Sequence, residues 1–337
     1  MRIAEFLAID WSAPSDPLIQ PPRFSPVIAD PTFLFPEETP DGTWALFAHS
    51  AWGLHRYESA DGTVWADRGL VIRNAMRPFV RRVGEEYLLL YEAYAPFGLA
   101  LTALPGRRRW KSAIAAARSA DLRRWKVIPA PVLAPTLPWM RDEKLGDAVS
   151  NPCLVRTEEG SLLYFSASLV WLDDCGFCEP RSIGRARGGP PETTPMAFVP
   201  ESEPVIDPAS EALPRADVER AVGAGSLKVL AFEDGYVGLQ NKIYRDGSGR
   251  SRSAIFLLVS EDGARWRDGR EAPLVAPASG WTASHVYACD CRYREANGTW
   301  YLYFNARDGW RIRDGVERIG RIVGRPAAGG RRERDNR

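Results

Sequence analysis

Short apolar runs separated by glycine-containing turns recur along the whole chain. Apolar runs of four to eight residues bounded by turn residues are typical of β-strands. In five places a turn leads into an aromatic-rich run, and a shorter apolar run precedes it. The pattern therefore predicts five copies of one antiparallel hairpin, with second strands in PDGTWALFAHS (40–50), VGEEYLLLYEA (83–93), EEGSLLYFSAS (158–168), EDGYVGLQNKI (233–243) and ANGTWYLYFNA (296–306).

A second phrase, Ser-x-Asp-(Gly/Leu)-x-x-Trp, follows a third apolar run in three of these units. It reads ESADGTVW at 58–65, RSADLRRW at 118–125 and VSEDGARW at 259–266. Asp-Gly favours a tight turn because glycine adopts positive φ without steric cost. Each phrase therefore predicts a turn between a third strand and a fourth strand that the Trp opens.

Four antiparallel strands per unit make a sheet that cannot bury both of its faces alone, whereas five such sheets arranged radially can. We therefore predict an all-β fold, a five-bladed β-propeller with four-stranded antiparallel blades around a central funnel. A two-domain sandwich would also give short strands with glycine turns, but the fivefold reuse of one pattern favours the propeller. The predicted single domain covers residues 1–325, with blades starting near 26, 73, 147, 224 and 286, and a disordered basic tail follows at 326–337.

Blade five lacks an obvious fourth strand after RIGRIVGR (318–325). The N-terminal segment RIAEFLAI (2–9) could supply that strand and close the ring. Two long segments, 94–111 in blade two and 169–196 in blade three, are expected to rim the axis as loops.

The first strand of each blade in a propeller lines the central axis, so residues at the starts of these strands converge at one mouth. The predicted starts are Asp30, Arg77, Asn151, Lys228 and Asp290.

Composition narrows the class of partner. The formal net charge is +1 over 337 residues, which offers no strong field for nucleic acid, and no stretch approaches the roughly 20 apolar residues of a membrane span. Five cysteines and an N-terminus without a signal-peptide pattern predict a cytoplasmic location. We find no phosphate-binding loop, dinucleotide fingerprint or His-Glu-x-x-His motif, so we expect no cofactor. We also expect a monomer or weak homo-oligomer that binds a small molecule.

The pair Cys175 and Cys178 has Cys-x-x-Cys spacing. A zinc site, a loop disulfide and two unreactive thiols are all compatible with it, and we predict no metal.

Three short motifs resemble those of a known group. ADP at the start of blade one, RP in blade two and NP in blade three, together with the Ser-x-Asp turns, are similar to the five-bladed propeller glycosidases of glycoside hydrolase families 43, 32 and 68. The likeness covers roughly residues 25–325. It implies a propeller that cleaves glycosidic bonds with carboxylates facing each other across the sugar.

The resemblance carries over to this sequence only in part. It implies that Asp30 is the catalytic base or nucleophile. Where the family has a second Asp in blade three this chain has Asn151, and near the family's acidic Glu of blade four it has Ser226-Leu227-Lys228. An amide cannot titrate, so we expect Asp290 or Glu92 to be the catalytic partner.

Each candidate also has a structural explanation. Asp30 before a proline can cap a turn. Glu92 can be a hydrogen-bonded core carboxylate, and Arg77 and Lys228 can neutralise Asp30 and Asp290 inside the ring. If these cations contact substrate instead, they favour an anionic sugar. The residues expected to bind substrate are Arg77, Asn151, Lys228, His49, Asp147, Trp171, His285 and Asn305.

The sequence therefore predicts a glycoside hydrolase-like enzyme acting on a small, sugar-containing molecule, with an anionic glycoside among the candidates. The missing family carboxylates leave two alternatives. One is a non-hydrolytic enzyme on the same fold, such as a cyclase, lyase or transferase of specialised metabolism. The other is a propeller that binds carbohydrate without turnover.

Overall fold

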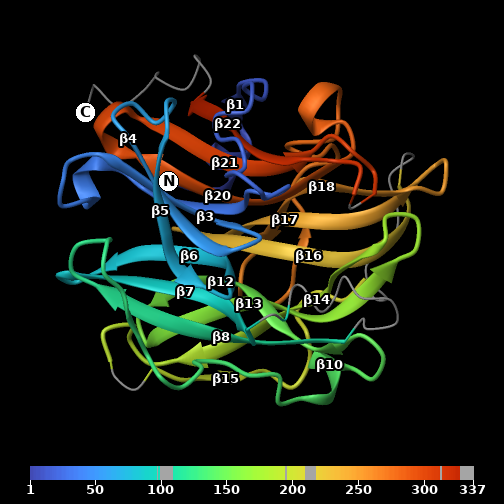
Figure 1. Cartoon of the computed structure of the whole chain (residues 1–337), viewed down its shortest axis with the longest axis horizontal. Coiled ribbons are helices and arrows are strands. Elements are labelled where there is room, and N and C mark those ends of the chain that lie inside the picture. Colours follow the sequence, from blue (N-terminus) through green and yellow to red (C-terminus); the bar gives the residue numbers. More distant parts are fainter. Residues whose placement is uncertain (97, 99–108, 194–195, 209–217, 312, 327–337) are drawn as a thin grey trace, which may run out of the picture.

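The computed structural model describes residues 1–337 except 97, 99–108, 194–195, 209–217, 312 and 327–337. Residues 327–337 of the predicted disordered tail and most of the segment 94–111 therefore lie outside the described residues, whereas Pro326 of the tail ends strand β22 (Glu317–Pro326). Within the described residues the strands form five sheets that follow one another along the chain, in the colour order of Figure 1. The predicted all-β, five-bladed propeller is confirmed.

The blades are built as follows. Blade one contains β2 (Ala29–Leu34), β3 (Trp44–Ser50), β4 (Gly53–Ser59) and β5 (Ala66–Arg73), and blade two contains β6 (Ala75–Val83), β7 (Glu86–Tyr94), β8 (Trp110–Ser119) and β9 (Lys126–Val127), with β10 (Arg141–Asp142) and β11 (Gly146–Asp147) beside β8. Blade three contains β12 (Val149–Thr157), β13 (Gly160–Leu172), β14 (Phe177–Gly188) and β15 (Phe198–Pro200), and blade four contains β16 (Val218–Phe232), β17 (Gly235–Asp246), β18 (Ser251–Ser260) and β19 (Arg267–Asp268). Blade five contains β20 (His285–Arg294), β21 (Thr299–Arg307), β22 (Glu317–Pro326) and β1 (Ile9–Trp11). The helical elements described are α1 (Ile3–Leu7) and the short 3₁₀ helices η1 (Pro36–Glu38), η2 (Pro138–Met140), η3 (Gly280–Thr282) and η4 (Glu295–Asn297).

The N-terminal strand completes blade five. β1 pairs antiparallel with β22, with Ile9 opposite Pro326, and Figure 1 shows the two strands side by side. The strand begins only at Ile9, the last residue of the segment 2–9 considered from the sequence, because residues 3–7 form helix α1. Phe6 of this helix is fully buried, with its ring 4.8 Å from that of Trp300. The segment thus contributes both a strand and a core side chain.

Replacing Phe6 with alanine should lower the free energy of unfolding by about 3–5 kcal/mol, because the cavity left in blade five cannot fully collapse. Chemical denaturation followed by tryptophan fluorescence measures this change. The matched control is Phe24→Ala, which removes a ring that is 77% exposed and should change stability by less than about 0.5 kcal/mol. Equal stabilities of the two variants would show that the N-terminal segment does not hold the ring closed.

The repeated Ser-x-Asp turns form as predicted. In the first of them Ser59 Oγ accepts the N–H of Gly62 at 2.9 Å, and Asp61 Oδ1 accepts the N–H of Thr63 at 2.7 Å. The Trp that follows each turn packs edge-on against an aromatic ring on the second strand of the preceding blade. These pairs are Trp65–Tyr303, Trp125–Phe47 and Trp266–Tyr164. The repeat therefore recurs because it joins neighbouring blades.

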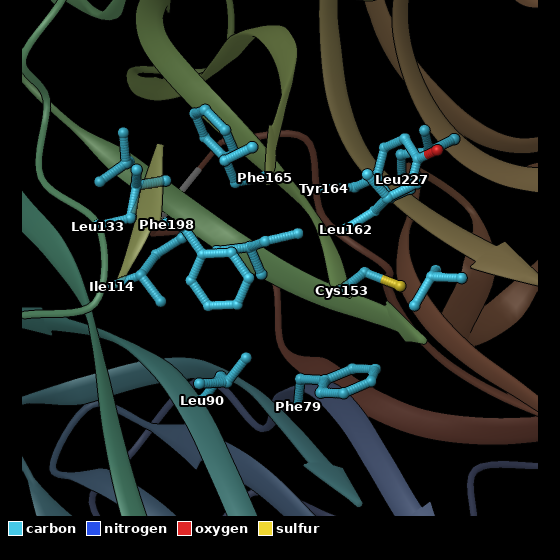
Figure 2. Close-up of a cluster of buried hydrophobic side chains, with 14 of the residues drawn as sticks. Phe79, Leu90, Ile114, Leu133, Cys153, Leu162, Tyr164, Phe165, Phe198 and Leu227 are labelled. Carbon is cyan, nitrogen blue, oxygen red and sulfur yellow. The ribbon is translucent and has the colours of Figure 1, made fainter. Parts of the chain in front are cut away.

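A large buried cluster fills the space between blades two, three and four (Figure 2). Phe79 and Leu90 of blade two, Phe165 of blade three and Leu227 of blade four are each at most 1% exposed. Burial of such apolar surface contributes roughly 25 cal/mol per Å². The blades are therefore held in fixed relation, and so are the axial strands that carry polar residues.

Each first strand carries a two-residue β-bulge near its start. In blade one the pairing jumps from Ala29 to Thr32, so two residues stand opposite one. The other four blades show the same jump, and bulges re-aim side chains. The equivalent axial positions are Asp30–Pro31, Arg77–Pro78, Asn151–Pro152, Ala224–Gly225 and Tyr287–Ala288.

This register corrects the predicted axial positions in blades four and five. Lys228 and Asp290 lie beyond the bulges, whose first residues are Ala224 and Tyr287. Proline occupies the second bulge position in the first three blades and marks it in the sequence, but neither of the last two blades has a proline there. Gly225 stands at that position in blade four with φ +60°, a conformation that favours glycine.

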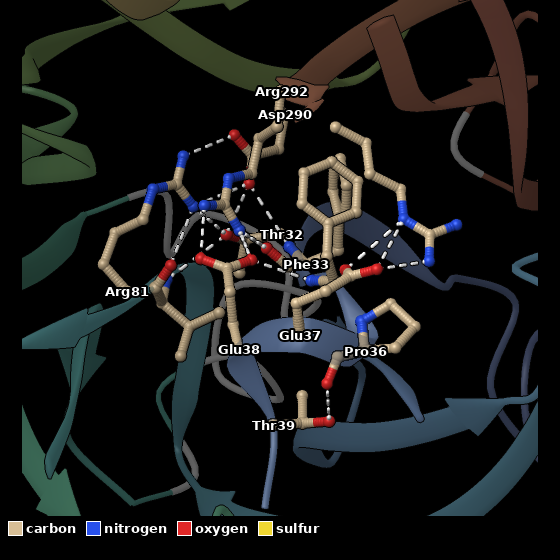
Figure 3. Close-up of polar contacts among 12 residues, drawn as sticks. Thr32, Phe33, Pro36, Glu37, Glu38, Thr39, Arg81, Asp290 and Arg292 are labelled. Atoms are coloured by element: carbon tan, nitrogen blue, oxygen red, sulfur yellow. Dashed lines mark hydrogen bonds and ion pairs between the residues drawn. The ribbon is translucent and has the colours of Figure 1, made fainter. Parts of the chain in front are cut away.

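Asp290 belongs to a polar network further along the axis (Figure 3). Its carboxylate accepts hydrogen bonds from both terminal nitrogens of Arg81, at 2.9 and 3.0 Å, and from the Thr32 hydroxyl at 2.8 Å. Beside it, Arg292 pairs with Glu38 of η1. Burial alone would raise the pKa of Asp290, but the charge and hydrogen bonds of Arg81 outweigh it and lower the pKa to about 2. The network joins blades one, two and five.

Candidate active site

Asp30 is held in one orientation at the axial mouth. Its φ of 52° lies in the left-handed region, which Asp and Asn enter more readily than other residues with side chains. Its N–H donates to Asn305 Oδ1 at 3.1 Å, and its carboxylate lies 3.0 Å from Nδ1 of His49 on β3. The side chain keeps 14% of its surface exposed, so the carboxylate is fixed but still reachable.

The surroundings of Asp30 favour its charged form. Burial raises the pKa of this carboxyl, but the hydrogen bond and charge of His49 and the positive charges of Arg77 and Lys228 outweigh it. The pKa of Asp30 therefore lies below that of an ordinary aspartate, and the group is ionised at neutral pH. A carboxylate in this form can act as a general base or a nucleophile.

Arg77 takes the equivalent position in blade two, also with positive φ. It pairs with Glu92 on β7, which is completely buried and accepts the Nε1–H of Trp110 at 2.8 Å. Burial would lower the pKa of Arg77, but the carboxylates of Glu92 and Asp30 raise it. Because both oxygens of Glu92 are occupied, its geometry suits holding Arg77 rather than transferring a proton.

Asn151 adds an amide group to the mouth, and Lys228 adds a positive charge below it. Asn151 has φ 49° and donates from Nδ2 to Ser150 Oγ at 3.3 Å. Lys228 lies deeper, donating from Nζ to the Pro152 carbonyl at 3.2 Å and lying 5.0 Å from the ring centroid of Phe79. Asn151 can bind a hydroxyl group, while Lys228 supplies positive charge beneath Asp30.

A carboxyl group that sequence reasoning did not single out, Glu179 on β14, lies in the same group. It is buried, and no hydrogen bond or ion pair holds its carboxyl within the part of the chain that the structure describes. Burial raises the pKa of Glu179 to about 8, the negative charges of Glu317 and Asp30 add to the effect, and Arg77 opposes it. Glu179 is therefore mainly protonated at neutral pH, the form that donates a proton.

Glu179 reaches the mouth because its hairpin is longer than the sequence suggested. β13 runs to Leu172 and β14 begins at Phe177, so most of the segment 169–196 is paired strand rather than a loop. The signal for this was the long, mostly apolar run LLYFSASLVWL (162–172), which is long enough to carry the returning strand to the axis.

Blade five contributes a second hydrogen-bonded carboxyl. Asn305, which binds the backbone of Asp30, also donates from Nδ2 to Glu317 Oε2 at 3.1 Å, and Arg307 lies 3.4 Å from the other oxygen of Glu317. Burial raises the pKa of Glu317, and Arg307 opposes the shift. Tyr287, at the bulge of this blade, is also buried, and burial raises its pKa well above the usual value.

Comparisons with known proteins agree with this geometry at the level of the fold. No family model matches the sequence, and no curated protein matches it. Many solved structures match, and three of them show similarity along most of their length. A thermostable family-43 glycoside hydrolase is 14% identical with a TM-score of 0.56, and the match covers 87% of this chain and 89% of that one. The α-L-arabinofuranosidase PaAbf62A from Podospora anserina, in complex with cellotriose, is 15% identical with a TM-score of 0.58, covering 94% and 97%. An N-acetylgalactosamine deacetylase from F. plautii, in complex with blood group B trisaccharide, is 13% identical with a TM-score of 0.60, covering 94% and 95%.

The chain has the fold of the propeller glycoside hydrolases. The resemblance expected from the motifs is therefore confirmed as a shared fold. Asn151 takes the axial register of Asp30 in blade three, and the bulge of blade four holds Ala224 and Gly225, so neither blade places a carboxyl group there.

The structure separates several predicted site residues from the mouth. Asp290 is 1% exposed and bound by Arg81, so it is not available to a substrate. His285 is fully buried, stacked 5.5 Å from the ring of Tyr287. Burial, together with the charges of Arg307 and Arg252, lowers its pKa to about 3, so it is a neutral core residue rather than a proton shuttle.

Asp147 and Trp171 belong to other strands than the residues around Asp30, namely β11 and β13. Asp147, on β11, lines a shallow cavity of about 380 Å³ together with Tyr94, Lys111 and Ser112. Trp171 is half-buried on the extended hairpin. Among the described residues Asp147 makes no hydrogen bond or ion pair with the group around Asp30, while Trp171 shares its hairpin with Glu179.

None of the five cysteines forms a disulfide in this structure, and this includes Cys175 and Cys178. Burial raises the pKa of Cys175 to about 12, which keeps it a thiol. The described residues contain no cluster of three or more His, Cys, Asp or Glu side chains arranged to hold a metal ion. None of the helices in the described ranges has the length and hydrophobicity that a membrane span requires.

Proposed function

We propose that the protein is a hydrolase of the glycosidase type, with Asp30 as base or nucleophile and Glu179 as proton donor. One observation carries this proposal. The carboxyl groups of Asp30 and Glu179 belong to one cluster of side chains at the axial mouth, and their surroundings lower the pKa of Asp30 while raising that of Glu179. Such divergence assigns acid and base roles. It also supplies the second carboxyl that glycosidic cleavage needs and that the sequence motifs lacked.

The proposed reaction uses each group in the form that its surroundings favour. Glu179 protonates the leaving oxygen, while Asp30 activates water or attacks the anomeric carbon. His49 and Asn305 orient Asp30, and Asn151 binds a sugar hydroxyl. Arg77 pairs with Glu92, and Arg307 pairs with Glu317. These ion pairs neutralise both arginines, so they leave no excess of positive charge that would favour an anionic ligand. We therefore propose a neutral saccharide as the substrate.

The saccharides bound to two of the similar structures support a sugar-containing ligand here. The direct test is release of aglycone from a panel of aryl glycosides of common pentoses and hexoses, with the products of matching oligosaccharides followed by chromatography. Release of at least one sugar by the wild-type protein is the expected result. Saccharide binding in calorimetry without any release would reject hydrolysis.

A second candidate is an enzyme on the same fold with non-hydrolytic chemistry. Asn151 and Ala224 at axial positions favour it, because the resemblance places carboxylates at or near those positions. If the panel yields no hydrolysis while an Asp30 variant still alters the product formed from a host metabolite extract, this candidate replaces the first.

The pH dependence of kcat/KM should show which group is the acid. Asp30 must be ionised, so the acidic limb should fall below the usual aspartate pKa; Glu179 must be protonated, so activity should fall as pH rises through about 8. Glu179→Gln should remove the alkaline limb and lower kcat/KM by about 10²- to 10⁴-fold for substrates with poor leaving groups. Substrates with an acidic aryl leaving group should be affected far less, because they do not need the proton.

The matched control is Glu317→Gln, which removes another carboxyl with a raised pKa from the same mouth. It should retain the limb near the Glu179 pKa. An alkaline limb that survives in Glu179→Gln and disappears in Glu317→Gln would transfer the role of acid to Glu317.

A further inference from the structure

Exposed aromatic rings are few in the described residues, and two of them lie on the same side of the mouth. Phe24 is 77% exposed and Trp52 is 50% exposed; the third, Tyr293, is 36% exposed and lies towards the end of β20. Large apolar side chains left in water together beside a polar site commonly mark a binding surface. We call Phe24 and Trp52 the aromatic rim.

The two rings are attached to one rigid frame. The N–H of Ala51, next to Trp52, donates to Ser25 Oγ at 3.1 Å, and Ser25 follows Phe24. Ser25 Oγ also donates to the Val27 carbonyl at 2.8 Å. Phe24 itself has φ 63°, which is uncommon for a bulky residue.

The turn that carries Trp52 is fixed from the other side as well. The N–H of Trp52 donates to Ser50 Oγ at 3.1 Å, and Ser50 contacts Nε2 of His55 at 3.0 Å. Gly53, with φ +133°, closes the turn against β5, where any Cβ would lie 2.2 Å from the Ile72 carbonyl oxygen. A ring presented on such a frame loses little entropy when a ligand stacks on it.

The frame is continuous with the candidate active site. His49 lies near the end of β3, three residues before Trp52, and contacts Asp30. On the Phe24 side, the carbonyl of Pro26 accepts the N–H of Glu317 at 2.9 Å. The aromatic rim therefore flanks the mouth between blades one and five.

We propose that the aromatic rim binds a further sugar ring of the same saccharide, so that the protein prefers an oligosaccharide of at least two or three units over a simple glycoside. This inference rests on the proposed function for the class of ligand. The apolar faces of sugar rings stack on aromatic side chains, and the Arg23 guanidinium, 4.6 Å from the centroid of Phe24, adds a hydrogen-bond donor for hydroxyl groups.

A saccharide fits this surface better than a second protein does. Each aromatic side chain can bury only about 150–250 Å², so two rings provide much less than the roughly 800 Å² per partner of a stable protein interface. A single sugar chain that starts in the mouth and extends over its edge needs no larger area.

The test measures binding separately from turnover. The quenching of tryptophan fluorescence is titrated in the Glu179→Gln protein with cellotriose, xylotriose, arabinotriose and mannotriose, each at up to about 10 mM, and with the matching monosaccharides. We expect at least one trisaccharide to bind about tenfold or more tightly than its monosaccharide, and Trp52→Ala and Phe24→Ala each to reduce that preference several-fold, with calorimetry confirming the loss where the fluorescent residue is removed. The control Val64→Ala, which changes an exposed residue at the other end of blade one (77% exposed), should leave the preference unchanged.

The outcomes that overturn the proposal are distinct from failure of the proposed function. Unchanged trisaccharide affinity in both rim variants, or no binding by any member of the panel, rejects the aromatic rim as a sugar site. Self-association or vesicle binding that is lost in Trp52→Ala assigns the rings to a second copy or a lipid surface instead. Trisaccharide binding that depends on Trp52, without hydrolysis by the wild-type protein, supports the rim while rejecting the proposed chemistry.

Discussion

Replacing Asp30 with asparagine should lower kcat/KM for the cleaved saccharide by about 10²- to 10⁴-fold and leave the protein folded. The amide cannot accept the proton or attack the sugar, so the reaction loses its base or nucleophile. The substitution should not strain the backbone, because asparagine tolerates positive φ. Asn151 already occupies the equivalent position in blade three with φ 49°.

The measurement is steady-state kinetics together with thermal unfolding of each variant. The matched control is Glu261→Gln, which removes an exposed carboxylate in the Ser-x-Asp turn of blade four and should leave both readouts unchanged. Saccharide affinity should fall by much less than the rate in Asp30→Asn. A folded Asp30→Asn protein with wild-type turnover would remove Asp30 from the chemistry.

Replacing Asp290 with asparagine should act on stability instead, lowering the free energy of unfolding by about 3 kcal/mol. Loss of one partner of a buried ion pair typically costs about 3–5 kcal/mol, and the lower end applies because the Arg81 side chain is 23% exposed. The turnover of the folded fraction should stay near that of the wild type. This separates the network in Figure 3 from the catalytic group.

The double variant Arg81→Met/Asp290→Asn provides the control for the ion pair, because removing both charges should recover much of the lost stability. The pH dependence gives a second check. The pKa of Asp290 is lowered to about 2. Its contribution to stability is therefore fully present above the usual aspartate pKa and is lost as the pH falls from there to about 2. A folded Asp290→Asn protein of unchanged stability but greatly reduced turnover would restore Asp290 as a catalytic residue.

The fold could be predicted from the sequence because its repeats have a structural cause. The Ser-x-Asp turns satisfy their own backbone groups, and the Trp that follows joins adjacent blades, as in the contact between Trp125 and Phe47. Such local requirements leave a pattern that can be read without an alignment. The same holds for Asp30, Arg77 and Asn151, because the proline after each marks the bulge.

The candidate site was predicted less completely, for two physical reasons. In blades four and five the bulge has no proline, so nothing in the sequence distinguishes Ala224 and Tyr287 from residues further along the strand, and the charged residues Lys228 and Asp290 were assigned in their place. Glu179 was missed because its pKa depends on burial by distant parts of the chain. Only the length of the hairpin in blade three brings it to the axis.

The central claim is that a neutral carboxylic acid at Glu179 faces an ionised Asp30. Infrared difference spectroscopy during a pH titration measures it directly, with Glu179→Gln used to assign the signal of the protonated carboxyl group. We expect that signal to be present at neutral pH and to disappear as pH rises through about 8. Replacing Asp30 with asparagine should not remove any protonated-carboxyl signal at neutral pH, because Asp30 is ionised there. A Glu179 carboxyl that is already ionised in weakly acidic solution would contradict the account.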